Sequence, residues 1–174
     1  MNIGITTGIP VTDQDGIFAE AIAIATQMCE VVRGQVVISS AVKALYESEN
    51  RQARIDKELI RTLSPQEEQF LMQLVDYCEK SWRNPNFDVA TFSSELGFSK
   101  SQLYRKLKQL TGISPNNFIR EYRLHKAVGL LHDQFGNISE IALETGFNSP
   151  AYFTKCFGKK FGILPSKYAQ LHIA

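Results

Sequence analysis

The chain has 174 residues, of which 44% are hydrophobic and 21% charged, and its formal net charge at pH 7 is +1. This composition is ordinary for a soluble globular protein of one medium domain or two small ones. No stretch approaches the roughly 20 apolar residues that cross a membrane, and the first residues lack the basic and apolar pattern of a secretory signal. The sequence therefore predicts a cytoplasmic protein without a membrane partner.

Residues 1–46 show the pattern of a small α/β fragment. Short β-branched runs predict strands at Ile3–Thr6 and Val36–Ser39. Between them, apolar residues at helical spacing predict a helix over Ile17–Val32, and another helix is expected over Ser40–Tyr46. A fragment of about 45 residues has little core of its own, so we expect it to pack on the rest of the chain or on a second copy.

Residues 47–63 are charged and poor in large apolar groups, which predicts a partly helical linker. A strong helix start follows, with Ser64 as N-cap, Pro65 at the first helical position and Glu67 in the first turn. The apolar face of this helix consists of Phe70, Leu71, Leu74, Val75 and Cys78. Asn84-Pro85-Asn86 is expected to end it.

The remaining C-terminal part is expected to be helical throughout, so that residues 64–174 hold about seven helices and the chain as a whole is α+β. Helical spacing and capping residues place the helices after the first one at Val89–Leu96, Ser99–Leu110, Pro115–Leu131, Ile138–Thr145, Pro150–Phe161 and Pro165–Leu171.

Part of this helical region occurs twice. The first copy runs from Glu95-Leu96-Gly97-Phe98 to Gly112-Ile113-Ser114-Pro115, and the second from Glu144-Thr145-Gly146-Phe147 to Gly162-Ile163-Leu164-Pro165. The copies are offset by 49 residues at their start and by 50 at their end. Each contains a short helix, a glycine turn and a second, basic helix, which is the pattern of a helix-turn-helix unit that presents its second helix to the major groove of DNA. Two units predict two recognition helices on one face, in successive grooves.

Each turn has residues suited to its geometry. Gly97 and Gly146 lie where the chain turns sharply, and glycine takes a positive φ there at little cost. The phenylalanine after each glycine can fill the angle between the helices, and Ser99 and Asn148 are expected to cap the second helices. Leu103 and Leu107 of copy one match Phe153 and Phe157 of copy two, which leaves the opposite helix face for ligands.

A basic stripe accompanies the repeat. Residues 97–126 carry seven cations against one acid, and residues 151–167 carry four cations and no acid. The cations are Lys100, Arg105, Lys106, Lys108, Arg120, Arg123, Lys126, Lys155, Lys159, Lys160 and Lys167. A run of cations by itself could simply be a solvent-exposed helix face, and a single helix hairpin could belong to an ordinary helical bundle. The repeated hairpin and the basic charge together favour a nucleic-acid partner.

Residues 64–171 resemble the DNA-binding domain of the AraC/XylS family of bacterial transcription regulators. The resemblance rests on Ile141–Phe147, Tyr152–Phe157 and Phe161–Tyr168, and on Ser99–Leu107 for the family's first motif. It implies two helix-turn-helix units joined by the long helix, sequence-specific binding of double-stranded promoter DNA, regulation of transcription and no enzymatic activity. RNA polymerase is a further candidate partner.

The resemblance also implies which side chains face DNA. The base-facing residues of the first recognition helix would be Ser101, Gln102, Tyr104 and Arg105, and those of the second Pro150, Ala151, Thr154 and Lys155. Further DNA contacts are expected from Ser99, Lys100, Lys108, Asn148, Ser149 and Lys159. The second set departs from the family pattern, because Pro150 and Ala151 offer no donor and Lys155 cannot form the rigid fork of arginine. We therefore expect the first helix to carry most base discrimination.

The N-terminal fragment resembles the last part of a class III nucleotidyl cyclase domain. The similarity lies in Ile3–Gly8, Phe18–Met28 and Gly34–Ser39. Ala23 and Gln27 stand where that family has an Asn and an Arg that stabilise the transition state, so the fragment is expected to be a degenerate remnant with a role in structure, homodimerisation or sensing. A nucleotide-binding or cyclase-related protein, with a nucleotide as effector, is the alternative function.

No catalytic residue, metal site or cofactor is predicted. Asp13 and Asp15 are close enough in sequence to suggest a pair of functional carboxylates, but they are expected to lie in a solvated loop. Cys29, Cys78 and Cys156 are odd in number and far apart, with no C-x-x-C pair, which is typical of reduced core thiols and not of a disulfide framework.

Overall fold

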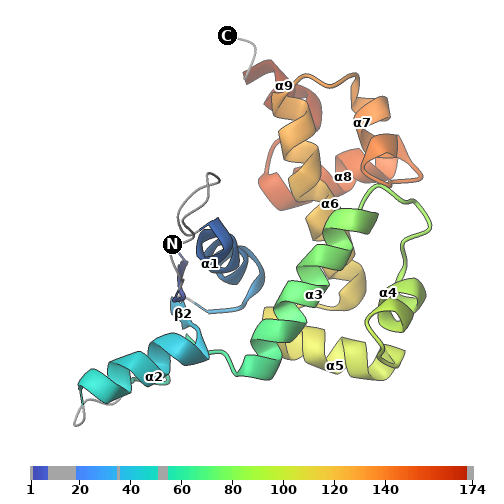
Figure 1. The fold of residues 1–174 in the computed structure, drawn as a ribbon. Coiled ribbons are helices and arrows are strands. Elements are labelled where there is room, and N and C mark those ends of the chain that lie inside the picture. Colours follow the sequence, from blue (N-terminus) through green and yellow to red (C-terminus); the bar gives the residue numbers. More distant parts are fainter. Residues whose placement is uncertain (1, 8–18, 35, 51–54, 172–174) are drawn as a thin grey trace. The chain divides into compact units, whose positions relative to one another are not determined.

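The computed structural model describes residues 2–7, 19–34, 36–50 and 55–171. The chain divides into two compact units, which we call the sheet unit (residues 1–75 and 106–112) and the helical unit (residues 76–105 and 113–174). Figure 1 shows the elements of both in chain order. In the described residues, no helix is both long and apolar enough to cross a membrane.

Three short parallel strands in the order β1-β2-β3 form the sheet: β1 (Ile3–Ile5), β2 (Val36–Ile38) and β3 (Ile60–Thr62). The helix α1 (Ala19–Val31) connects β1 to β2 and packs on both. It approaches β1 closely because Gly4 has no side chain, and a Cβ there would collide with the carbonyl oxygen of Ala25. The predicted β1–α1–β2 order is thus confirmed in the described residues; Asp13 and Asp15 lie outside them.

Within residues 47–63, predicted as a partly helical linker, the described residues contain the end of α2 (Ser40–Glu49) and the strand β3, which was not predicted. Ile60 pairs with Val36 of the buried strand β2, and Leu63 continues the pairing with an N–H bond to the Ile38 carbonyl at 2.9 Å. β3 is too short for an alternating pattern, so its strand character comes from the free edge of β2 and not from its own composition.

The two units interleave along the chain, because α3 (Pro65–Ser81) and α5 (Lys100–Thr111) each contribute to both. This division differs from the predicted boundary at residue 64. The first turns of α3 and the last turns of α5 belong to the sheet unit, in which Arg61 binds Glu67 of α3 and the Leu110 carbonyl of α5. The assignment of residues 1–46, 47–63 and 64–174 as three functional segments stays a prediction.

The helical unit also contains α4 (Val89–Glu95), α6 (Pro115–His132), α7 (Ile138–Glu144), α8 (Pro150–Phe161) and α9 (Pro165–Leu171). From residue 64 onward the described chain thus holds the expected seven helices. The long helix α6 packs against α7, α8 and α9. The core of this cluster consists of Leu124, Ala127, Leu131, Ile141, Ala142, Phe147, Phe153 and Phe157.

The three cysteines are free thiols. Cys78 is fully buried, and Cys29 and Cys156 are partly buried. Burial raises the pKa of the Cys78 thiol, with Glu79 acting in the same direction, so the neutral thiol is favoured.

Candidate nucleic-acid interface

Local hydrogen bonds fix the start of α4 and the turn between α4 and α5 in the first helix pair. Asp88 caps α4 by accepting from the Thr91 N–H at 2.8 Å, and bonds from the backbone and hydroxyl of Thr91 hold the pKa of this carboxyl below its usual range. At the turn, Gly97 has a φ of +72°, and the Phe98 N–H bonds back to the Ser93 carbonyl at 2.8 Å. Such a left-handed residue ends a helix and redirects the chain.

The second pair, α7 and α8, repeats this geometry. Asn137 and Glu140 form a reciprocal capping box at the start of α7. Gly146 has a φ of +77°, and the Phe147 N–H bonds to the Ala142 carbonyl at 2.9 Å. The sharp turns predicted at the two glycines are therefore confirmed.

The two turns differ by one residue. In copy one, Ser99 directly follows Phe98 and accepts from the Gln102 N–H at 3.2 Å, so its predicted role as a cap is confirmed. In copy two the N-cap is Ser149, which accepts from the Tyr152 N–H at 3.3 Å, and the prediction of Asn148 as cap was wrong. Asn148 is the extra residue that changes the offset between the copies from 49 to 50, and Pro150 then occupies the first helical position.

The helix α5 separates a buried from an exposed face. Leu103, Leu107 and Leu110 are buried, and the exposed side chains are those of Lys100, Ser101, Gln102, Tyr104, Arg105, Lys108 and Gln109. The Gln102 side chain is already used, because its Oε1 accepts from the Ser99 N–H at 2.9 Å. Bidentate recognition of adenine uses the same oxygen, so a base contact by Gln102 would share its Oε1 with the Ser99 N–H.

The helix α8 buries Phe153 and Phe157 and exposes Ala151, Lys155 and Lys159, while Pro150 and Thr154 are half-buried. Tyr152 has half of its side chain exposed (50%). Its ring lies 6.2 Å from that of Phe147 at the rim of the core, and it precedes the buried Phe153 by one residue, which turns it about 100° away around the helix. No sequence periodicity separates such a flanking position from a core position.

Several cations of the predicted basic stripe bind within the protein instead. Lys126 pairs with Glu79, and Lys160 pairs with Glu121. Arg120 donates to Asn117 at 3.0 Å. Burial raises the pKa of Glu79, but hydrogen bonds from Lys126 and Tyr122 outweigh it and leave that pKa below its usual value. Lys160 is exposed despite its ion pair, and the other exposed cations of the stripe are Lys100, Arg105, Lys108, Lys155, Lys159 and Lys167.

Arg123 of α6 has a structural role that its charge does not reveal. Its guanidinium donates to three carbonyls, those of Trp82 at 3.1 Å, Asn84 at 2.7 Å and Phe87 at 3.4 Å. Burial lowers the pKa of Arg123, but the group stays a cation at neutral pH. It thereby holds the segment between α3 and α4 in place. No sequence pattern predicts that this cation binds backbone carbonyls of a segment about 40 residues earlier in the chain.

A hollow of about 400 Å³ lies beside Arg123 and extends to the start of α8. The second pair contributes Asn148, Ser149 and Tyr152 to the lining of this hollow, and the start of α4 contributes Asp88.

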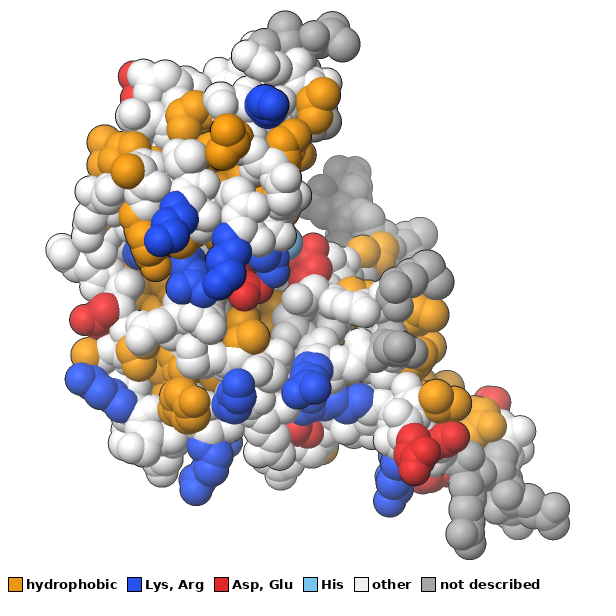
Figure 2. All heavy atoms as spheres, turned by 180° about the vertical axis from the view of Figure 1, so that it is seen from behind, with side chains coloured by type: hydrophobic (Ala, Val, Ile, Leu, Met, Phe, Trp, Pro, Cys, Tyr) orange, Lys and Arg blue, Asp and Glu red, His pale blue; other side chains and the backbone are white. Residues whose placement is uncertain are grey.

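Figure 2 shows one face of the chain, on which Lys and Arg side chains lie between uncharged and hydrophobic ones. Among the described residues there is no group of three His, Cys, Asp or Glu side chains that could hold a metal ion.

Known proteins share this arrangement. The family model of a helix-turn-helix domain matches residues 92–170. The chain is 46% identical over 107 residues to Histidine kinase P4 of Formosa agariphila, a match over 62% of this chain and 8% of that protein. It is 34% identical over 88 residues to the probable transcription factor PqrA of Proteus vulgaris, over 51% of this chain and 72% of PqrA. The chain therefore spans less than a tenth of the kinase and most of the transcription factor.

Solved structures agree with these matches. An AraC-type transcriptional regulator from Chromobacterium violaceum superposes with a TM-score of 0.58 and 26% identity, over 63% of this chain and 97% of that one. The DNA-binding domain of the global transcriptional factor AdpA, solved in complex with a target DNA, gives a TM-score of 0.55 and 25% identity, over 58% of this chain and 90% of that one. With its two capped helix pairs and a transcription factor matched over most of its length, the chain belongs to the AraC family of helix-turn-helix transcription regulators.

Proposed function

We propose that this chain binds specific sites in double-stranded DNA through α5 and α8 and thereby regulates transcription. The observation that carries the proposal is the duplicated helix pair, in which each second helix buries one face and exposes a polar, basic one. A helix exposed in this way fits the major groove, which is about 12 Å wide. The DNA complex of the related AdpA domain supports the same partner for this chain.

The exposed residues suit different parts of the duplex. Arg105 offers the two parallel donors that guanine accepts, whereas Lys155 offers a single mobile charge suited to phosphate. Ser99 and Ser149 lie at helix starts, where backbone N–H groups favour a phosphate oxygen. Tyr152 joins the proposed contacts because it is exposed beside Ala151, which has no donor.

The central experiment is fluorescence anisotropy with duplex DNA. One pool of duplexes is selected for binding from random sequence and the other is unselected, and both are titrated over a range of salt concentrations. We expect the selected site to bind at least about 10³-fold more tightly than the unselected pool, with a steep dependence on salt. Equal affinity for both pools would contradict sequence-specific binding.

Replacing Arg105 by alanine is expected to weaken binding to the selected site by about 1–3 kcal/mol and to relax the preference at one base pair, because a bidentate contact to guanine is lost. Competition between single-base variants of the site measures this preference. Gln109→Ala, on an exposed position of the same helix outside the proposed base-facing set, is the control. If Arg105→Ala left affinity and preference unchanged, α5 would not be docked as proposed.

Lys159→Ala is expected to weaken binding to all duplexes alike and to reduce the salt slope by about 1, because one phosphate contact disappears. The measurement is the affinity for the selected and unselected pools across the salt series. A loss confined to the selected site would mean that Lys159 reads a base and not the backbone.

For residues 1–46 we propose a structural role in supporting α5, without catalysis. The cyclase-like similarity of this fragment stays a prediction, and so do the nucleotide effector and homodimerisation through it. Contact with RNA polymerase and a cytoplasmic location also stay predictions.

A further inference from the structure

The hollow of about 400 Å³ at the start of α8 is bounded by both helix pairs and by α6. Its lining consists of the residues just before α4, one face of α6, and the turn and first residues of α8. The buried members of the lining include the apolar Phe87, Ile119 and Phe147, and the exposed members include the polar Asn148 and Ser149. All lining residues and their neighbours along the chain belong to the described part. The hollow therefore combines apolar walls with a polar edge.

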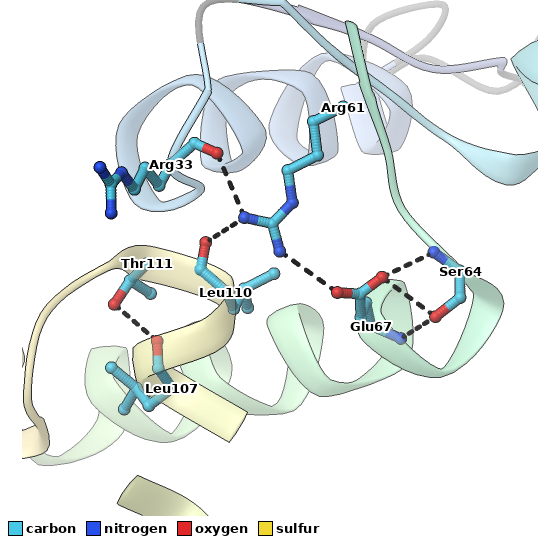
Figure 3. A network of polar contacts seen from close by, with 7 residues as sticks. All are labelled: Arg33, Arg61, Ser64, Glu67, Leu107, Leu110 and Thr111. Carbon is cyan, nitrogen blue, oxygen red and sulfur yellow. Dashed lines mark hydrogen bonds and ion pairs between the residues drawn. The ribbon is translucent and has the colours of Figure 1, made fainter. Parts of the chain in front are cut away.

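Arg120 brings a positive charge from α6 to this hollow. Its side chain is half-buried, and its Nη2 donates to Oδ1 of Asn117, three residues earlier on the same helix, at 3.0 Å. In the described part of the chain no carboxylate pairs with it. Arg61 of the sheet unit differs, because Glu67 neutralises it at 3.2 Å (Figure 3). A guanidinium has five N–H donors, so Arg120 keeps its charge and most of its donors for a ligand.

The other charges of the lining leave the hollow favourable for an anion. Arg123 binds three backbone carbonyls, which are neutral and do not cancel its charge. Asp88 is the carboxylate of the lining, and it accepts from the N–H and the hydroxyl of Thr91. These bonds, together with the nearby positive charge of Lys100, hold the pKa of Asp88 below its usual range. Two cations thus face one carboxylate that already has a cationic neighbour.

The place of the hollow among the helices indicates which anion it meets, if the proposed function holds. In helix-turn-helix docking the second helix of a pair enters the major groove, and the first helix crosses the sugar-phosphate backbone. The hollow is bounded by the start of α8, a second helix, and by the start of α4, the first helix of the other pair. Two recognition helices in successive grooves leave one stretch of backbone between them, and this stretch passes the hollow.

We propose that the hollow receives this stretch of DNA backbone and that Arg120 binds one of its phosphates. The apolar walls suit the sugar, and the exposed amide of Asn148 and hydroxyl of Ser149 offer further donors at the edge. A phosphate contact fixes the register of a protein on the duplex without reading sequence. Because Arg120 lies on the helix that joins the two pairs, its contact positions α5 and α8 together.

The first test is the affinity of Arg120→Gln for the selected and unselected duplexes over the salt series. We expect a loss of about tenfold for both at low salt and a salt slope reduced by about 1, because one phosphate contact disappears. Arg120→Lys keeps the charge and is expected to restore the slope. Arg83→Gln is the matched control, because Arg83 is already paired with Glu144 at 2.6 Å, and it is expected to change neither quantity.

The second test locates the phosphate. In a set of selected duplexes, one phosphate at a time is replaced by an uncharged methylphosphonate. For the parent chain, one replacement between the two half-sites is expected to weaken binding about tenfold, and for Arg120→Gln the same replacement is expected to cost about twofold or less, because its partner is absent. A purely structural role of Arg120 would weaken binding to every duplex and would show no such coupling.

The outcomes separate this proposal from the proposed function. An Arg120→Gln variant with the affinity and salt slope of the parent overturns the phosphate contact, and so does a loss that is coupled to no single phosphate. A loss confined to the selected duplex also overturns it, since Arg120 would then read a base. If Arg105→Ala relaxes the base preference while Arg120→Gln changes nothing, the proposed function stands and this contact does not. A parent chain that binds no duplex overturns both.

Discussion

Replacing Gly146 by alanine is expected to lower the free energy of unfolding by about 2–5 kcal/mol, the sum of a left-handed backbone and an overpacked contact. Gly146 has a φ of +77°. A Cβ at this position would lie 2.8 Å from the Trp82 carbonyl oxygen and 2.8 Å from Nε of Arg123. Neither atom can move easily, because Arg123 itself binds the carbonyls of Trp82, Asn84 and Phe87.

Gly97 provides a matched control. It is the equivalent residue of the first copy, with a φ of +72°, but a Cβ there would meet no atom within 4 Å. Gly97→Ala is therefore expected to cost only the backbone part, about 1–2 kcal/mol. Urea unfolding followed by the fluorescence of Trp82, the single tryptophan of the chain and a buried one, measures both. Equal losses in the two variants would contradict the close contact at Gly146.

Truncation of Phe157 to alanine is expected to lower the free energy of unfolding by about 3–5 kcal/mol, since a fully buried aromatic side chain leaves a cavity that the core cannot fill. The Phe157 ring has no exposed surface. Its centroid lies 5.7 Å from that of Phe153, 4.6 Å from that of Phe161 and 5.9 Å from that of Tyr168. The side chain thus joins α8 to α9 at the centre of the helical core.

Phe135→Ala is the control for this truncation, because the Phe135 side chain is 55% exposed. We expect it to change stability by about 0.5 kcal/mol or less. Thermal unfolding measured by far-ultraviolet circular dichroism compares the two variants with the parent chain. A similar small effect of both truncations would mean that the core around Phe157 is loosely packed.

The two glycine turns and the cap of α8 show which structural details could not be predicted from sequence. The repeat places Gly97 and Gly146 at equivalent turns, and both do have a positive φ. Their difference in surroundings arises only because the Trp82 carbonyl and Arg123 pack against the second turn. The same limit applies to Asn148, where aligning the copies at the wrong offset put the cap one residue too early.

The basic stripe shows this limit for charge. All of its cations look alike in sequence, yet Arg123, Lys126 and Lys160 bind partners 36 to 47 residues away along the chain. Lys155 and Lys159 of the same stripe remain exposed. Which cations can reach DNA is thus decided by the partners that the fold brings close, and the base-facing assignments themselves stay predictions.

The sequence by itself determined the helices from residue 64 onward, their turns and most of their caps, because these depend on side chains and backbone groups within about four residues of each other. Only the tertiary structure decided the strand β3, the exposure of Tyr152 and the internal roles of Arg61 and Arg123. β3 forms because its backbone pairs with the edge of β2. Arg61 and Arg123 bind carbonyl groups of residues far away in the sequence, and no local sequence pattern predicts these bonds. Their energies come from contacts between distant segments, and such contacts form only once the chain has folded.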